Sequence, residues 1–209
     1  MPARLVVVAG VNGAGKSSVA GQALLNSGGQ FYNPDLFARE LLDSNPQLAA
    51  EQANAAAWEF GRRGVERAIL NNAFFAFETT LGGKSISQAL LAAARAGAEV
   101  NVSYVGLSSP ELHIARVARR VAAGGHSIPE TKIRERFVSS RANLVMLMPY
   151  LASLRVYDNS VELDPRSGKL PRPILLLHMI VGKLRTHASL GSIPNWAKPL
   201  MAAALDAAK

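Results

Sequence analysis

A glycine-rich stretch near the N-terminus, Gly10-Val-Asn-Gly-Ala-Gly-Lys16-Ser17, has the spacing G-x-x-x-x-G-K-[ST]. Glycines let the backbone wrap closely around a phosphate and point successive N–H groups at it. The lysine supplies a point charge for the β- and γ-phosphates, and the hydroxyl that follows can ligate Mg²⁺. A chance glycine turn is the alternative, but this motif lies directly between a strand-like run and a helical pattern. The predicted nucleotide-binding residues are Gly10, Val11, Asn12, Gly13, Ala14, Gly15, Lys16, Ser17 and Ser18, with Ser17 as the metal ligand.

Two carboxylates follow strand-like segments. Asp35 lies at the predicted start of a helix just past a strand, at the sheet edge where α/β proteins bind ligands. Glu78, followed by Thr79, comes at the end of an aromatic apolar run, where an unpaired carboxylate is costly to bury. Asp35 could instead be a first-turn charge that stabilises its helix, and Glu78 could simply emerge into solvent. A role in ligand binding is favoured for Asp35, and substrate contact or water-mediated contact with Mg²⁺ is favoured for Glu78 and Thr79.

Basic residues gather between positions 111 and 141, which hold seven Lys or Arg against three Glu. Arg116 and Arg120 are four residues apart and share a helix face. In phosphoryl transfer, an arginine can neutralise charge on the migrating group, and a closing segment excludes water. We therefore predict a lid hinged at Gly124-Gly125, with at least one of Arg116 and Arg120 entering the site and with Arg134 and Arg136 as candidate substrate contacts. A solvated arginine face, or a surface that binds acidic RNA, is the alternative.

The elements that must position these residues alternate along the chain. Strand-like runs occupy Arg4–Ala9, Phe31–Asn33, Ala73–Thr80, Glu99–Leu107 and Leu154–Asp158. Helical patterns cover Lys16–Leu25, Pro34–Leu42, Gln47–Leu70, Ser85–Ala96, a helix capped by Ser109 through Ala123, a helix from Ser127 or Pro129 to about Met148, and a tail from Pro194 to Ala208.

Strands separated by helices need crossover connections, which favour a mostly parallel sheet covered on both faces. The expected fold is an α/β three-layer sandwich of the P-loop NTPase type with a helical lid. We expect one domain over residues 1–209, with the lid at about 110–141 and a C-terminal helical tail at about 190–209.

Composition excludes several classes of protein. The 209 residues are 49% apolar and 18% charged, which excludes wholesale disorder. The chain has no cysteine, which excludes disulfides, thiolate metal sites and cysteine nucleophiles. Apolar runs such as Ile174–Val181 are far shorter than the roughly 20 residues of a membrane span, and no signal-peptide pattern opens the chain. We expect a cytoplasmic protein without membrane contact, whose net charge of +8 favours anionic ligands.

The order of the motifs resembles that of the zeta-toxin-like P-loop kinases, and more closely their chromosomal branch of predicted ATPases. The resemblance runs from about residue 4 to 160, and His126 stands where the toxins have an arginine. The segments that carry it are the glycine loop, F-Y-N-P-D (31–35), F-E-T-T-L (77–81), R-V-A-R-R-V-A-A-G-G-H-S-I-P-E (116–130) and Asp158-Asn159-Ser160.

This resemblance implies transfer of the γ-phosphoryl group of ATP, with Mg²⁺, to a hydroxyl of a small molecule. The toxins phosphorylate UDP-N-acetylglucosamine, which makes a nucleotide sugar a candidate acceptor and an antitoxin-like protein a candidate partner. Asp35 would be the general base, and Lys16, Arg116 and Arg120 would complete the catalytic set. An ATPase that binds nucleic acid or another acidic partner is the alternative, but the basic segment contains only one aromatic residue, Phe137, for stacking on bases.

Overall fold

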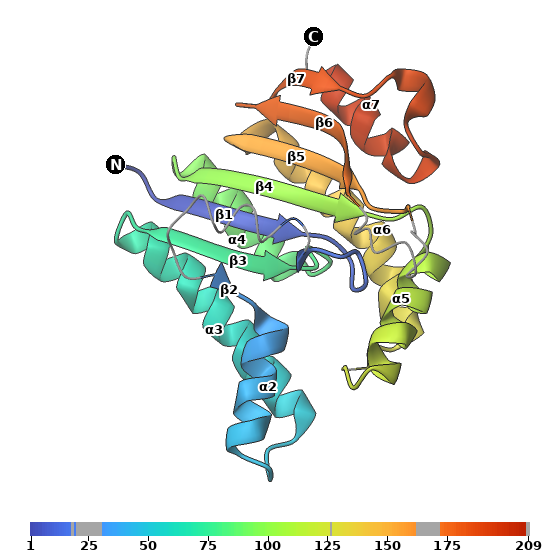
Figure 1. Ribbon diagram of the computed structural model, residues 1–209. Coiled ribbons are helices and arrows are strands. Elements are labelled where there is room, and N and C mark those ends of the chain that lie inside the picture. Colours follow the sequence, from blue (N-terminus) through green and yellow to red (C-terminus); the bar gives the residue numbers. More distant parts are fainter. Residues whose placement is uncertain (18, 20–30, 126, 162–171, 208–209) are drawn as a thin grey trace.

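The computed structural model describes residues 1–17, 19, 31–125, 127–161 and 172–207. A seven-stranded sheet crosses this part of the chain in the order β2-β3-β1-β4-β5-β6-β7 (Figure 1). The strands β1 to β5 are parallel, and β6 and β7 are added antiparallel at one edge. Their bounds are Arg4–Ala9 (β1), Phe31–Tyr32 (β2), Phe74–Thr79 (β3), Glu99–Gly106 (β4), Ser153–Asp158 (β5), Ile174–Ile180 (β6) and Lys183–His187 (β7). The predicted α/β fold with a mostly parallel sheet is confirmed.

The hairpin of β6 and β7 was not predicted from the sequence. The two strands are joined at Val181 and Gly182, both with positive φ, as required by the tight turns that match the twist of a hairpin. The strand β7 is mostly exposed and rich in cations, so it lacks the apolar pattern that marked the other strands. The run at Ile174–Val181, noted only as too short for a membrane span, is therefore largely a sheet strand.

The described helices agree with the predicted ones, with ends that differ by three residues at most in the body of the chain. The predicted helix at Lys16–Leu25 lies almost entirely outside the described residues. Figure 1 shows α4 and α6 behind the sheet and α2 and α5 projecting beyond it. The bounds are Pro34–Ser44 (α2), Ala50–Leu70 (α3), Lys84–Arg95 (α4), Pro110–Ala122 (α5), Glu130–Leu147 (α6) and Lys198–Asp206 (α7), with 3₁₀ turns at Met148–Tyr150, Leu190–Ser192 and Asn195–Ala197.

The main core lies between the sheet and its helices and draws residues from Leu5 to Ala204. The helix α3 approaches the sheet closely because it presents glycines: a Cβ at Gly64 would lie 2.4 Å from the ring of Phe75. None of the helices in the described ranges is both long and apolar enough to span a bilayer.

Two smaller apolar clusters hold the helices that project from the sheet. Val11, Val117 and Ile133 join the glycine loop to α5 and α6. Ala38, Ala53 and Ala57 join α2 to α3. The helices α5 and α2 are therefore anchored to different parts of the molecule and face each other across a gap.

Candidate nucleotide and acceptor site

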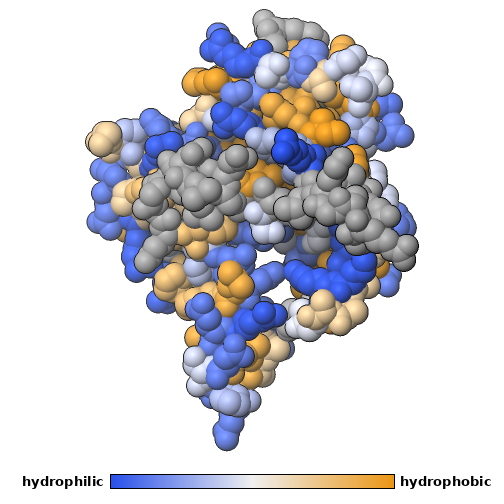
Figure 2. All heavy atoms as spheres, viewed as in Figure 1, coloured by the Kyte–Doolittle hydropathy of each residue, from blue (hydrophilic) through white to orange (hydrophobic). Residues whose placement is uncertain are grey.

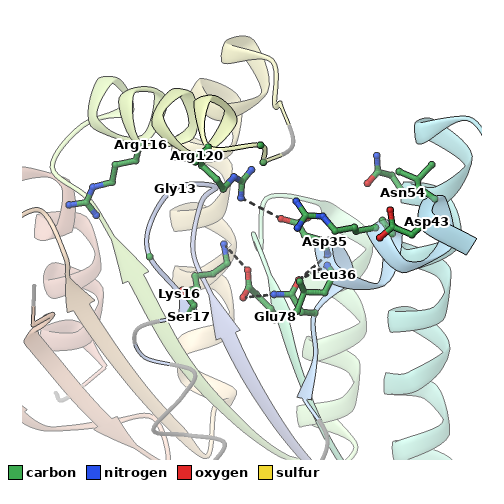
Figure 3. Close-up of a pocket in the computed structure, with 18 residues that line it drawn as sticks. Gly13, Lys16, Ser17, Asp35, Leu36, Asp43, Asn54, Glu78, Arg116 and Arg120 are labelled. Atoms are coloured by element: carbon green, nitrogen blue, oxygen red, sulfur yellow. Dashed lines mark hydrogen bonds and ion pairs between the residues drawn. The ribbon is translucent and has the colours of Figure 1, made fainter. Parts of the chain in front are cut away.

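A cavity of about 780 Å³ opens beyond the carboxyl ends of β1, β2 and β3, between α2 and α5 (Figure 3). The space-filling view shows this hollow between the two projecting parts of the molecule (Figure 2). Ligands of open α/β sheets bind at this edge, and the volume is that of an ordinary small-molecule site. The lining residues are Gly13, Gly15, Lys16, Ser17, Asn33, Asp35, Leu36, Ala38, Arg39, Leu42, Asp43, Asn54, Glu78, Arg116, Arg120, Ala123, Gly124 and Gly125.

The glycine loop follows β1 and turns into the cavity. Gly13 and Gly15 both have φ of 81°, in the left-handed region that favours glycine. A Cβ at Gly13 would lie 2.7 Å from the carbonyl oxygen of His113, so the loop packs directly on α5. Ser17 is exposed and lines the cavity beside Lys16, whereas Ser18 lies outside the described residues. Two of the loop glycines therefore lie where the backbone takes the left-handed conformation, and nucleotide binding by the loop stays a prediction.

Lys16 is buried among oxygen atoms, with 7% of its side chain exposed. Its Nζ donates to the carbonyl of Gly10 at 2.8 Å and lies 3.3 Å from the carboxylate of Glu78. Glu78 is itself largely buried, at 14% exposed, and also accepts from the side-chain amide of Asn33 at 3.3 Å. Burial of either charge would be costly without the other, so the pair explains how both are held at the strand ends.

Asp35 faces the basic helix across the mouth of the cavity. Its carboxylate lies 3.8 Å from the guanidinium of Arg120, with both side chains substantially exposed (Figure 3). A pair this exposed contributes at most about 1 kcal/mol, so a substrate can displace it. Asn33 accepts hydrogen bonds from the backbone N–H groups of Asp35 and Leu36, at 2.9 and 3.2 Å, and fixes the start of α2.

The structure brings all four predicted catalytic residues, and Glu78 with them, to this cavity. Lys16, Asp35, Glu78, Arg116 and Arg120 come from four separate segments and all line it. Arg116 also donates to the carbonyl of Asn159 at 2.9 Å.

Of the predicted nucleotide-binding residues, Gly10, Val11, Asn12 and Ala14 do not line the cavity, and neither do three of the predicted substrate contacts. Arg134 pairs with Glu111 at 2.6 Å on the exposed side of the helix pair. Arg136 donates to the side chain of Asn12 at 2.8 Å, and the Thr79 hydroxyl accepts from the backbone of Leu81 at 3.1 Å. Substrate contact by Arg134, Arg136 and Thr79 stays a prediction, as does the closing movement of the lid. His126 lies outside the described residues.

Sequence reasoning missed two supporting side chains of the site, Asn33 and His113, and left a third, Asn159, undecided. Asn33 was seen only as part of the motif before Asp35, although an asparagine before proline is a common helix cap. His113, on α5, gave no signal, yet it is 1% exposed and its Nδ1 bonds the carbonyl of Asn12 at 2.9 Å. Asn159 follows β5, and its side chain donates to the carbonyl of Ala14 at 2.9 Å.

The site suits a triphosphate better than a metal held by protein alone. Within the ranges described there is no group of three or more His, Asp or Glu arranged to hold a metal ion. Mg²⁺ commonly binds one or two protein oxygens together with substrate phosphates and waters. Ser17 beside Lys16 fits that arrangement, with the loop glycines available for the phosphates.

Comparison with known proteins places the chain in a family. Residues 2–164 match the family model of the zeta toxin. A Haemophilus influenzae protein of uncharacterized function is 31% identical over 146 residues, which are 66% of this chain and 94% of the relative.

Two solved structures of one complex share the fold. A chain of the native AvrRxo1-ORF1:AvrRxo1-ORF2 complex has a TM-score of 0.65 at 16% identity, covering 99% of this chain and 71% of that one. In the same complex solved with ATP, the TM-score is 0.63 at 17% identity; the match covers 97% of this chain but only 64% of that one.

The PezAT chromosomal toxin–antitoxin system of Streptococcus pneumoniae gives a TM-score of 0.51 at 15% identity, over 75% of this chain and 68% of that one. At these identities the structural likeness is one of fold. The family match covers the glycine loop, Asp35, Glu78 and the arginines of α5, so the resemblance in the motifs is confirmed. The chain belongs to the zeta toxin family.

Proposed function

We propose that this protein is an ATP- and Mg²⁺-dependent kinase that phosphorylates a hydroxyl group of a small molecule bound between α2 and α5. The observation that carries the proposal is that Lys16, Asp35 and Arg120 line one and the same cavity. Membership of the zeta toxin family and a fold shared with a complex solved with ATP support a phosphotransferase of the P-loop type.

Each residue has a role that its position permits. The N–H groups of the loop and the Lys16 ammonium bind the β- and γ-phosphates. Asp35 takes the proton of the acceptor hydroxyl while the hydroxyl oxygen attacks the γ-phosphorus. The bond between the γ-phosphorus and the β–γ bridging oxygen breaks, which releases ADP. Arg116 and Arg120 neutralise charge that spreads over the migrating group. Mg²⁺, held by Ser17 and the phosphates, would supply further neutralisation.

The acceptor would occupy the part of the cavity formed by α2 and α3. Arg39, Asp43 and Asn54 line that part and offer donors and acceptors suited to several hydroxyl groups, while Leu36 and Leu42 offer apolar contact. A sugar-like acceptor fits this mixture of groups. UDP-N-acetylglucosamine is the first candidate to test, because the toxins that this sequence resembles use it.

A protein partner of the antitoxin type belongs to the same proposal. The PezAT relative is described as a toxin–antitoxin system, and the AvrRxo1 relative was solved as a complex of AvrRxo1-ORF1 with AvrRxo1-ORF2. Co-expression with the product of a neighbouring gene, followed by size-exclusion chromatography and an activity assay, tests for an inhibitory partner.

The direct test is incubation of the protein with ATP, Mg²⁺ and a panel of nucleotide sugars and small metabolites, scored by the mass gain of one phosphate. We expect Asp35→Asn to leave ATP affinity nearly intact and to lower product formation by about 100-fold or more, since a general base contributes about 10²–10⁴-fold. Glu40→Gln is a matched control, because Glu40 is exposed on the same helix and is not among the residues that line the cavity.

Unchanged turnover in Asp35→Asn would show that another group accepts the proton. If no small molecule gains phosphate while nucleic acid stimulates ATP hydrolysis, the alternative of a nucleic-acid-binding ATPase takes the place of the kinase.

A further inference from the structure

Two carbonyl groups of the glycine loop are held by side chains from distant parts of the chain. The Nδ1 of His113 lies 2.9 Å from the carbonyl oxygen of Asn12. The side-chain amide of Asn159 donates to the carbonyl of Ala14 at 2.9 Å. Both side chains are almost completely buried, at 1% and 4% exposed. These contacts join α5 and the end of β5 to the loop that would carry the phosphates.

The hydrogen bond to Asn12 determines the tautomer of the neutral imidazole. A carbonyl oxygen can only accept, so Nδ1 carries a hydrogen, and in the neutral ring Nε2 is then a bare acceptor. Nε2 is buried and has no hydrogen-bond partner within the described part of the chain. Burial also lowers the pKa of His113 to about 4, in agreement with a neutral ring. His113 therefore acts as a fixed donor rather than as a charged group.

Each of these carbonyls belongs to the same peptide unit as the N–H of the following glycine. In a planar trans peptide the C=O and the N–H point in opposite directions. Holding the carbonyl of Asn12 away from the cavity therefore directs the N–H of Gly13 the opposite way, and the bond to Ala14 does the same for Gly15. Both glycines line the cavity, and neither N–H donates to another backbone group in the described ranges.

The glycines make such support necessary. Gly13 and Gly15 both have φ of 81°, and glycine populates several backbone regions at similar free energy. A loop with such freedom can rotate its peptide planes and lose the N–H groups that form an anion site. A buried donor on each carbonyl opposes that rotation.

We propose that His113 and Asn159 are positioning residues for nucleotide binding, which aim the N–H groups of Gly13 and Gly15 at the phosphates by holding the carbonyls of Asn12 and Ala14. This inference rests on the proposed nucleotide site. It assigns neither residue a contact with the nucleotide itself. Arg136 assists by holding the side chain of the same Asn12.

The test uses three substitutions that differ in where a donor is placed. The amide nitrogen of asparagine can reach the place of Nδ1, whereas that of glutamine reaches the place of Nε2. We expect His113→Leu and His113→Gln to weaken ATP binding about tenfold, the equivalent of one lost hydrogen bond to a charged phosphate. His113→Asn should restore most of the affinity, and Asn159→Leu should weaken it as His113→Leu does. Affinities are measured by titration calorimetry with ATP and with inorganic triphosphate.

Two further measurements separate positioning from loss of stability. Urea unfolding gives the stability of each variant, and Val65→Ala, in the main core away from the loop, supplies a destabilised control that should bind ATP normally. The KM for the acceptor should stay unchanged in the His113 variants.

The outcomes are distinguishable. Wild-type protein that binds neither ATP nor triphosphate would overturn the proposed function itself. Wild-type binding together with unaltered affinity in His113→Leu would overturn only the positioning role. An equal loss of ATP affinity in His113→Asn and His113→Leu would also overturn the positioning role, because a donor at the place of Nδ1 would then not contribute to binding.

Discussion

The residues of the candidate site differ in how far the sequence reveals them. Lys16, Asp35 and Glu78 were predicted because each lies in a short motif next to a strand end, so local pattern and topology suffice to place them. His113 was not, because its partner Asn12 is 101 residues away and only the packing of α5 on the loop brings them together. Asn159 is a similar case, 145 residues from Ala14. Contacts of this kind are set by tertiary structure and leave no local signal.

The buried His113 makes stability depend on pH. The pKa of His113 in the folded protein is lowered from 6.5 to about 4. Burial is the main cause; the Asn12 carbonyl opposes it, and the positive charges of Lys16, Arg116 and Arg141 act in the same direction as burial. The unfolded chain then binds more protons than the folded one between these values. The contribution of this residue is complete above pH 6.5 and is lost as pH falls toward 4.

Between pH 7.5 and 5 we expect the free energy of unfolding of the wild type to fall by about 2 kcal/mol more than that of His113→Asn. Urea unfolding at a series of pH values measures both, and the variant removes the contributions of the other titrating groups. Parallel curves for the two proteins would mean that His113 titrates normally in the folded state.

At the scale of elements, α2 is the helix whose position matters most for the proposed catalysis. It carries Asp35 and packs through the small cluster on α3 rather than through the main core. Its start is fixed by Asn33, which caps the helix and also donates to Glu78 at 3.3 Å. The strong helical patterns and caps predicted α2 and α5 well, including the cap by Ser109. The charged strand β7 was missed because an edge strand needs no buried face.

Substitutions at Asn33 separate its two roles. Asn33→Ala should lower the free energy of unfolding by about 1 kcal/mol through loss of the cap. Asn33→Ser keeps a capping oxygen and should recover most of that stability, but its side chain is too short to donate to Glu78. We expect both variants to lower kcat by about fivefold, the value of one net hydrogen bond. Thermal unfolding and steady-state kinetics measure the two effects, and a kcat restored by serine would assign the whole effect to the cap.

At the scale of the molecule, the sheet continues beyond the family match. The match ends at residue 164, but β6, β7 and α7 follow and contribute to the main core. Trp196 packs so closely on β4 that a Cβ at Gly106 would lie 2.3 Å from its ring. Its Nε1 donates to Asp158 at 3.2 Å, and its carbonyl accepts from Arg141 at 2.9 Å. A single domain over the whole chain stays a prediction, which this shared core supports.

Replacement of Trp196 tests how firmly the C-terminal segment is joined to the rest. Trp196 is 3% exposed, so Trp196→Ala should lower the free energy of unfolding by about 3–5 kcal/mol. Trp58→Ala makes the same change at a side chain that is 48% exposed. We expect it to lower the free energy of unfolding by less than half as much as Trp196→Ala does. Urea unfolding compares the two. Similar losses would show that the C-terminal segment adds little to the stability of the whole.

The ion pair between Lys16 and Glu78 also affects which anions can enter. Before any ligand arrives, the ammonium already has a carboxylate and a backbone carbonyl as partners. A chloride ion or a simple carboxylate carries one negative charge, as the Glu78 carboxylate does. Replacing Glu78 by such an anion as the partner of Lys16 therefore gains little free energy. A polyphosphate carries several negative charges and can also accept hydrogen bonds from the loop, so it can replace Glu78 as the partner of Lys16. We therefore expect polyphosphates to bind at Lys16 more tightly than small monovalent anions do.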